Sequence, residues 1–177
     1  QSFGHAHLVL GEIVRDSSQR ATGSVVSTVL VLAACQMSRR GFTCRAQSSD
    51  VDSNEVRQQW EERRGEYSPE YYAYYGPDET SESIRGILDR YVARDASVLE
   101  LGCSSGRHLA HLLDHDFENL AGIEVNGDAF DVMEETYPEL AEQGTFYHAA
   151  IEDVVGDFDD GEFDAVYSVE TLQHLHP

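Results

Sequence analysis

Compact apolar runs alternate in the second half of the chain with segments whose apolar residues recur at helical spacing. Four runs have the length and composition of strands, namely Ser97–Leu101, Leu120–Val125, Thr145–Ala149 and Ala165–Val169. The first, bounded by Asp95 and Gly102, is apolar enough for a strand buried on both faces. Strands alternating with amphipathic helices predict a doubly wound α/β fold on a parallel sheet.

The helices expected between these strands show apolar residues three and four positions apart. These stripes are Ile84, Ile87, Leu88 and Tyr91 before the first strand; Leu109, Leu112 and Leu113 after it; and Ala129, Phe130, Met133 and Tyr137 after the second. Another helix, of modest stability, is predicted from about Asn54 to Arg64, with Trp60 as its only large apolar residue.

The segment Glu100–Gly106 (ELGCSSG) joins the first strand to its helix. Gly102 and Gly106 bracket three small residues, so a ligand can approach the backbone closely and meet free amides at the helix N-terminus. A phosphate-binding G-x-G-x-x-G loop has no acid at the strand end, whereas Glu100 stands there. A carboxylate at this place repels a pyrophosphate and favours a cationic group. The loop therefore suits a polar, nucleoside-like ligand that carries positive charge.

Glu100–Gly106 resembles the first motif of class I S-adenosylmethionine-dependent methyltransferases, which is an acid and any residue followed by a glycine-rich loop. The resemblance implies a Rossmann-like fold with the strand order 3-2-1-4. It also implies S-adenosyl-L-methionine as cofactor, whose ammonium and sulfonium suit the charge of Glu100. Ser104 departs from the family pattern, which usually has glycine there. The loop residues that the resemblance places against the cofactor are Glu100, Gly102, Cys103, Ser104, Ser105 and Gly106.

Glu124 ends the second predicted strand, 24 residues after Glu100. Nucleotide-binding βαβ units place a carboxylate at about this offset, where it accepts both hydroxyls of a ribose. A plain acid at a strand end is the alternative. The same offset occurs in NAD enzymes, but together with the Glu100 loop it favours S-adenosylmethionine, bound by Glu124 and Val125.

Further positions follow from the resemblance. Ile151 and Glu152 would recognise the adenine, while Asp153 either helps them or caps a turn. Ser168 and Val169 would line the crevice at the carboxyl ends of the strands. Ser97–Pro177 as a whole carries these motifs.

Two residues after the fourth strand are candidates for chemistry. His174 is the candidate general base for a hydroxyl or amine acceptor, and Glu170 could bind the substrate or a divalent ion. The alternative for His174 is packing beneath the cofactor. Methyl transfer needs mainly in-line positioning, so binding residues should matter more than acid–base groups. His108, His111 and His115 are predicted to be solvated helix positions, and no metal site is predicted.

Five tyrosines stand between Tyr67 and Pro77. In the resembled family a segment before the first motif often covers the cofactor, and Tyr72 and Tyr75, with Trp60, are predicted to do so here. Their flat rings suit a nucleoside or a sulfonium. A loop that only packs on the domain surface is the alternative.

The chain carries 33 acids against 12 bases, all of them Arg, which gives a net charge of −21. Salt screens the resulting repulsion, so the composition favours a salt-adapted protein of the halophilic archaeal type. Acids spread from Asp50 to Asp164 argue against a localised acidic patch, and the lack of clustered bases argues against nucleic-acid binding. Cys35, Cys44 and Cys103 lack metal-ligand spacing, so a reduced, cytoplasmic setting is expected.

Residues 1–47 differ from the rest in the sign of their charge. They hold five Arg and two acids, whereas residues 48–177 hold seven Arg and 31 acids. Val25–Ala34 is too short an apolar run to span a bilayer, but it resembles a signal-peptide core, and Leu32–Cys35 resembles a lipoprotein processing site. Three interpretations stay open: a disordered leader, with residues 1–36 outside the native coding sequence; an ordered accessory element; or a targeting segment.

The predicted organisation is therefore a leader at residues 1–47, a helical, tyrosine-rich cap at 48–94 and a cofactor-binding α/β domain at 95–177. Family domains normally add three strands after the fourth, so the sequence is expected to be a fragment of a longer protein, with an open apolar edge along 163–169. A half-domain completed by a partner chain is the other reading.

The predicted function is methyl transfer from S-adenosyl-L-methionine to an unidentified small molecule, without nucleic acid or stable membrane association. A nicotinamide-dependent oxidoreductase is one alternative; it would share Glu124 but prefer glycine at position 104 and lack the acid at position 100. A non-catalytic partner protein that retains the fold is the other.

Overall fold

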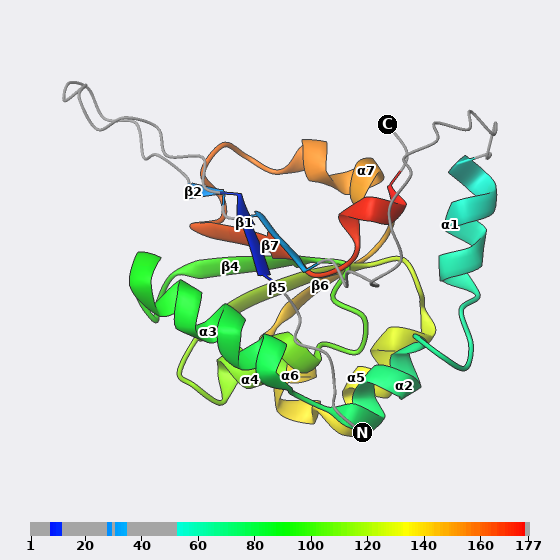
Figure 1. Ribbon diagram of the computed structural model, residues 1–177, viewed down its shortest axis with the longest axis horizontal. Helices are drawn as coiled ribbons and strands as arrows, with labels where there is room; N and C mark the ends of the chain where they lie inside the picture. The colour runs from blue at the N-terminus through cyan, green and yellow to red at the C-terminus, as the bar shows by residue number, and fades with distance from the viewer. Residues whose placement is uncertain (1–7, 12–27, 30, 35–52, 176–177) are drawn as a thin grey trace.

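A parallel sheet forms the centre of the protein (Figure 1). The computed structural model describes residues 8–11, 28–29, 31–34 and 53–175. The main strands are β4 (Ser97–Leu101), β5 (Asn119–Glu124), β6 (Thr145–His148) and β7 (Ala165–Ser168). Their order is β7-β4-β5-β6, all parallel, which is 3-2-1-4 read from β6. The predicted Rossmann-like α/β sheet and its strand order are confirmed.

Helices cover both faces of this sheet (Figure 1). One face carries α3 (Glu79–Tyr91), α4 (Arg107–Leu113), α5 (Asp128–Thr136) and α6 (Pro138–Gln143), and the other carries α7 (Ile151–Val154). The cap predicted at 48–94 contains α1 (Ser53–Glu61) and α2 (Pro69–Tyr75) as well as α3. Short 3₁₀ turns follow at η1 (Val155–Asp157) and η2 (Leu172–His174). None of the described helices is long and apolar enough to cross a lipid bilayer.

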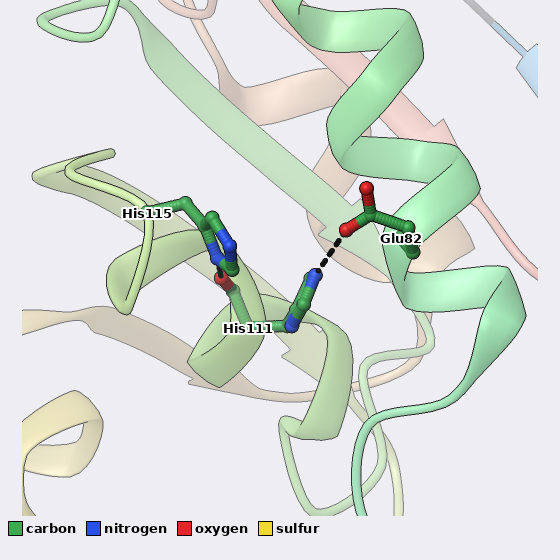
Figure 2. Close-up of side chains that lie close together, drawn as sticks. All are labelled: Glu82, His111 and His115. Atoms are coloured by element: carbon green, nitrogen blue, oxygen red, sulfur yellow. Dashed lines mark hydrogen bonds and ion pairs between the residues drawn. The ribbon is translucent and has the colours of Figure 1, made fainter.

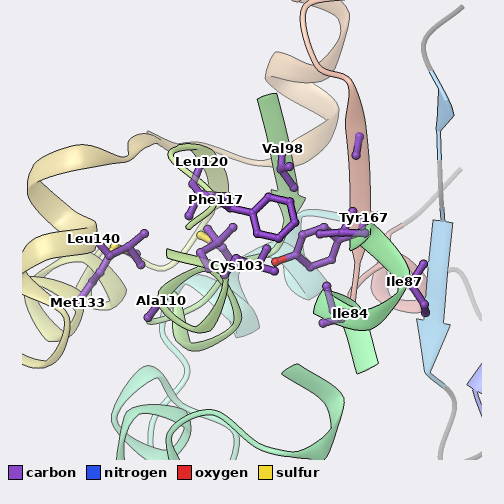
Figure 3. Close-up of a cluster of buried hydrophobic side chains, with 14 residues drawn as sticks. Ile84, Ile87, Val98, Cys103, Ala110, Phe117, Leu120, Met133, Leu140 and Tyr167 are labelled. Carbon is purple, nitrogen blue, oxygen red and sulfur yellow. The ribbon is translucent and has the colours of Figure 1, made fainter. Parts of the chain in front are cut away.

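Side chains of the strands alternate between two apolar clusters, one on each face of the sheet. Val98 and Leu120 belong to the larger cluster, under α3 and α4 (Figure 3), whereas Leu99 and Ala121 belong to the smaller one. Tyr91, expected to complete the stripe of α3, is 55% exposed instead. It is the last residue of that helix, and Val92 packs against the cluster after it.

Helix α3 is joined to α4 by polar contacts as well as by the apolar cluster. Asp78 caps α3 in a reciprocal capping box with Ser81. The Ser81 hydroxyl also lies 2.7 Å from Nδ1 of His108, and Nε2 of His111 lies 3.1 Å from Oε2 of Glu82 (Figure 2). The prediction that His108 is solvated is wrong, because α4 buries this ring against α3 and burial lowers its pKa to about 3. The ring is therefore neutral, and it shares a hydrogen bond with the Ser81 hydroxyl.

Three short strands come from the first 47 residues. β1 (Leu8–Gly11) pairs antiparallel with β3 (Val31–Ala34), and β2 (Thr28–Val29) pairs parallel with β7. The expected open edge of β7 is thus occupied by β2 at Ala165 and Val166. The remainder of the leader, with Cys35 and Cys44, lies outside the described residues.

Candidate functional site

A cavity of about 1170 Å³ opens at the carboxyl ends of β4, β5, β6 and β7. Its walls are the loops that follow these strands, together with side chains of α1 and α2. Ligand cavities commonly measure about 300–1,000 Å³, so this one has room for a nucleoside-sized ligand and a second molecule. The position is the one at which open α/β sheets bind ligands.

The loop between β4 and α4 is built on backbone conformations with positive φ. Gly102 has φ +75° and Gly106 has φ +78°. The amides of Gly102 and Cys103 both donate to the carbonyl of Ile123, at 2.8 and 3.0 Å, which holds the loop against the end of β5. Ser104, where the family pattern has glycine, adopts the left-handed region with φ 49°. A side chain there costs about 1 kcal/mol relative to glycine.

Glu124, at the end of β5, fastens this loop from the other side. Its carboxylate accepts hydrogen bonds from the amides of Ser104 at 2.8 Å and of Val125 and Asn126 at 2.9 Å. Burial raises its pKa, while these three amides act in the opposite direction. A carboxylate has about four acceptor positions, so one remains, on Oε2, for a ligand hydroxyl.

Glu100 does not point into open solvent at the lip of β4 but lies on the buried face, 1% exposed. The Tyr167 hydroxyl, from β7, donates to its Oε2 at 3.0 Å. Burial raises the pKa of Glu100 to about 8, against the opposing effects of Tyr167 and Arg107. The sequence predicts a carboxylate at this position, whereas burial favours the protonated carboxyl group at neutral pH.

The cavity brings together most residues that the sequence analysis selected. Those that line it are Tyr72, Glu100, Gly102, Cys103, Ser104, Glu124, Val125, Ile151, Glu152, Val169, Glu170 and His174. The other selected residues, Ser105, Gly106, Ser168 and Tyr75, are not part of the lining. Ser105 is fully buried, Gly106 packs against α5 and α6, and the Ser168 hydroxyl donates to the Leu101 carbonyl at 3.0 Å. Tyr75 is 61% exposed, with its ring against Tyr71 and Tyr74.

Helix α1 closes one side of the cavity with an aromatic ring. Trp60 lies 4.6 Å from the ring of His174, measured between centroids, and the Arg63 guanidinium lies over Trp60. Arg57, also on α1, bonds the Asp153 carboxylate of α7 at 2.6 Å. Asp153, whose role was left open, therefore links α7 to α1 and does not line the cavity.

The loop after β7 carries the two candidates for chemistry. Burial lowers the pKa of His174, and the nearby Arg63 charge acts in the same direction, so the imidazole is neutral and able to accept a proton. Burial raises the pKa of Glu170, whose backbone has φ 54°. The same loop brings Thr171 so close to Gly102 that a Cβ atom there would lie 2.3 Å from the Thr171 Oγ1.

Arg107, Asn126 and Thr171 also line the cavity, and the sequence analysis did not select them. Arg107 lies over the Tyr72 ring at 4.9 Å and bonds Asp78 at 3.0 Å, which joins α2 to the glycine loop. One signal for it was available, because it is the single base in residues 95–177. The contact of Thr171 with Gly102 has no local signal in the sequence.

Part of this site lies in a segment that matches a known family. Residues 98–177, which run from within β4 through β7, match a family model described as a methyltransferase domain, and this supports methyl transfer. A comparison with curated proteins gave no match.

Three solved structures are similar to this chain, and the first of them, with a TM-score of 0.50, shares the fold. WbdD, crystallised with the kinase inhibitor LY294002, is 23% identical with a TM-score of 0.50, covering 70% of this chain and 30% of that one. An S-adenosylmethionine-dependent methyltransferase from Thiobacillus denitrificans, in complex with S-adenosyl-L-homocysteine, is 21% identical with a TM-score of 0.46, covering 73% and 48%. The glycopeptide N-methyltransferase MtfA with sinefungin is 22% identical with a TM-score of 0.46, covering 57% and 44%. The chain spans less than half the length of each.

Proposed function

We propose that the protein transfers a methyl group from S-adenosyl-L-methionine to a small-molecule acceptor. The observation that carries this proposal is the match of residues 98–177 to a methyltransferase domain, on a cavity whose glycine loop is fastened by Glu124. The acceptor is a small molecule, because the cavity has room for one beside a nucleoside. No nucleic-acid contact and a cytoplasmic location belong to the same proposal.

The residues of the cavity fit the cofactor group by group. The free acceptor position of Glu124 suits a ribose hydroxyl, and the apolar side chain of Ile151 beside Glu152 suits an adenine ring. Glu100 lies beneath the glycine loop, where a cationic amino group would favour its ionised form. Bound there, the cofactor supplies a methyl group on a positively charged sulfur.

The remaining lining residues position the acceptor and exclude water. Trp60 and Tyr72 present aromatic faces to the cavity, and such faces attract cations. His174 is neutral, and its ring packs at an angle against Trp60. It would take the proton that a hydroxyl or amine acceptor loses. In-line placement of the acceptor does most of the catalytic work in this proposal.

Replacing Glu124 with glutamine is expected to weaken binding of S-adenosyl-L-homocysteine by at least about tenfold. The amide nitrogen cannot accept from the loop amides, and a lost hydrogen bond to a charged group costs roughly 1.5–3 kcal/mol. Isothermal titration calorimetry in molar KCl measures the affinity. Glu118→Gln, an exposed acid before β5, is the matched control and should bind like wild type. Equal affinities in both variants would contradict the proposed ligand, and preferential binding of NAD would favour an oxidoreductase.

We also propose that the net charge of −21 adapts the chain to concentrated salt. Screening shortens the Debye length from about 10 Å at 0.1 M to about 3 Å at 1 M. The midpoint temperature of unfolding should therefore rise steadily with KCl, as followed by circular dichroism. Sucrose at matched osmolality is the control, because it favours burial without screening charge. An equal rise in sucrose would show that repulsion between acids is not the cause.

A further inference from the structure

Three side chains with metal-binding atoms meet on the outer side of α3 and α4, and none of them lines the cavity. They are Glu82 on α3, His111 on α4 and His115 just after it (Figure 2). One atom of each lies within 4.8 Å of the others. The two histidines stand one helical turn apart, with ring centroids separated by 4.4 Å.

The orientation of His115 leaves a lone pair for a metal ion. Nδ1 of His115 lies 2.8 Å from the carbonyl oxygen of His111. A carbonyl only accepts, so Nδ1 carries the proton and Nε2 carries the lone pair. Ring nitrogens fixed in this way by a backbone carbonyl are typical of metal-binding histidines.

Glu82 faces His111, and Arg85 holds the carboxylate of Glu82 in place. Nε2 of His111 lies 3.1 Å from its Oε2, where a metal ion would replace the shared proton. Arg85 bonds both carboxylate oxygens and also bonds Asp89, so its positive charge is shared between two acids. It orients Glu82 in the way that outer partners orient metal-binding carboxylates.

We propose that Glu82, His111 and His115 bind a divalent transition metal ion, of which Zn²⁺ fits best. Two imidazole nitrogens and one carboxylate oxygen suit zinc, whereas Mg²⁺ and Ca²⁺ prefer oxygen ligands alone. Zinc bonds of about 2.0–2.2 Å place tetrahedral ligand atoms roughly 3.4 Å apart, so small side-chain rotations close the site. A water completes the tetrahedron. The ion clamps α3 to α4, and this site is independent of the proposed methyl transfer.

Titration with ZnCl₂ in excess MgCl₂ tests this site, because Mg²⁺ occupies the many surface carboxylates without competing for imidazole. We expect one tightly bound Zn²⁺ per chain by equilibrium dialysis and a higher midpoint temperature of unfolding. His111→Gln, His115→Gln and Glu82→Gln should each weaken this binding at least about tenfold. Glu79→Gln, which removes an acid from the same helix, should bind as wild type does.

The triple variant Glu82→Gln/His111→Gln/His115→Gln measures how much Zn²⁺ the other histidines of the chain bind. Its circular dichroism should match wild type, since these side chains are exposed or half-buried. Thermal stabilisation by Zn²⁺ should vanish in this variant. Co²⁺ serves as a spectroscopic substitute for Zn²⁺, and the visible absorption of tetrahedral Co²⁺ should appear with wild type but not with the triple variant. The proposal fails if the triple variant binds Zn²⁺ as tightly as wild type or if Mg²⁺ displaces the ion from wild type.

Discussion

Replacing Glu100 with glutamine is expected to raise the free energy of unfolding by about 4 kcal/mol near pH 8, and to change it little below pH 4.5, the ordinary pKa of the group. Burial raises the pKa in the folded state to about 8, so the folded protein binds a proton that the unfolded chain has released. Wild type therefore loses stability as the pH rises through this window. A glutamine, which does not titrate, removes that loss. Urea unfolding at several pH values measures the difference.

Two features keep this prediction specific to Glu100. The pKa of Glu124 is raised as well, so the slope of wild type contains both groups and only the difference between wild type and Glu100→Gln isolates one. Tyr167→Phe removes the donor that lowers the Glu100 pKa and should extend the loss of stability to higher pH. A difference that stays constant from acid to alkaline pH would show that the pKa of Glu100 is the same in the folded and unfolded states.

Gly102→Ala is expected to destabilise the protein by about 2–4 kcal/mol and to abolish binding of the proposed cofactor. The new Cβ would need a positive φ of 75° and would lie 2.3 Å from Oγ1 of Thr171. Gly65 gives a matched control, since its φ is +74° and nothing lies within 4 Å of a Cβ there. Gly65→Ala should thus cost only the backbone strain, about 1 kcal/mol, whereas Gly102→Ala adds the overlap, roughly 1–3 kcal/mol. Thermal unfolding and calorimetric titration measure the two effects.

Adding Thr171→Ala to Gly102→Ala tests the overlap directly. Removal of the Thr171 hydroxyl and methyl group should restore part of the lost stability. The Cβ atom of residue 171 remains, 2.8 Å from the new Cβ, so the double variant should still be less stable than Gly65→Ala. If Gly65→Ala and Gly102→Ala prove equally destabilising, a Cβ atom at position 102 does not overlap with Thr171 of the loop after β7.

The fold was accessible from the sequence because its signals are local. Apolar runs of strand length and the helical stripe of Ile84, Ile87 and Leu88 report which side chains face a core, and all three are buried. The two glycines of the loop have the positive φ that their residue type suggested. Tyr91 and His108 were misplaced, since a helix end and a helix–helix contact are set by neighbours that periodicity does not see.

In the candidate site too, residues with local sequence signals were found and residues defined by distant contacts were missed. Residue type and spacing selected Glu124 and the glycine loop, and these do meet at one cavity. Arg107 was missed although it stands alone as a base in its domain, because its contacts with Tyr72 and Asp78 join segments about 30 residues away.

By itself, the sequence determined the order of the four main strands, the sheet they form and the loop at its carboxyl edge, because backbone preference and burial pattern act over a few neighbouring residues. The tertiary structure decided the pKa of Glu100, the close approach of Thr171 to Gly102 and the contact between Glu82 and His111. Each of these depends on which side chains from distant segments exclude water or supply charge at one point in space. Desolvation and close packing are properties of that arrangement, and no local pattern carries them.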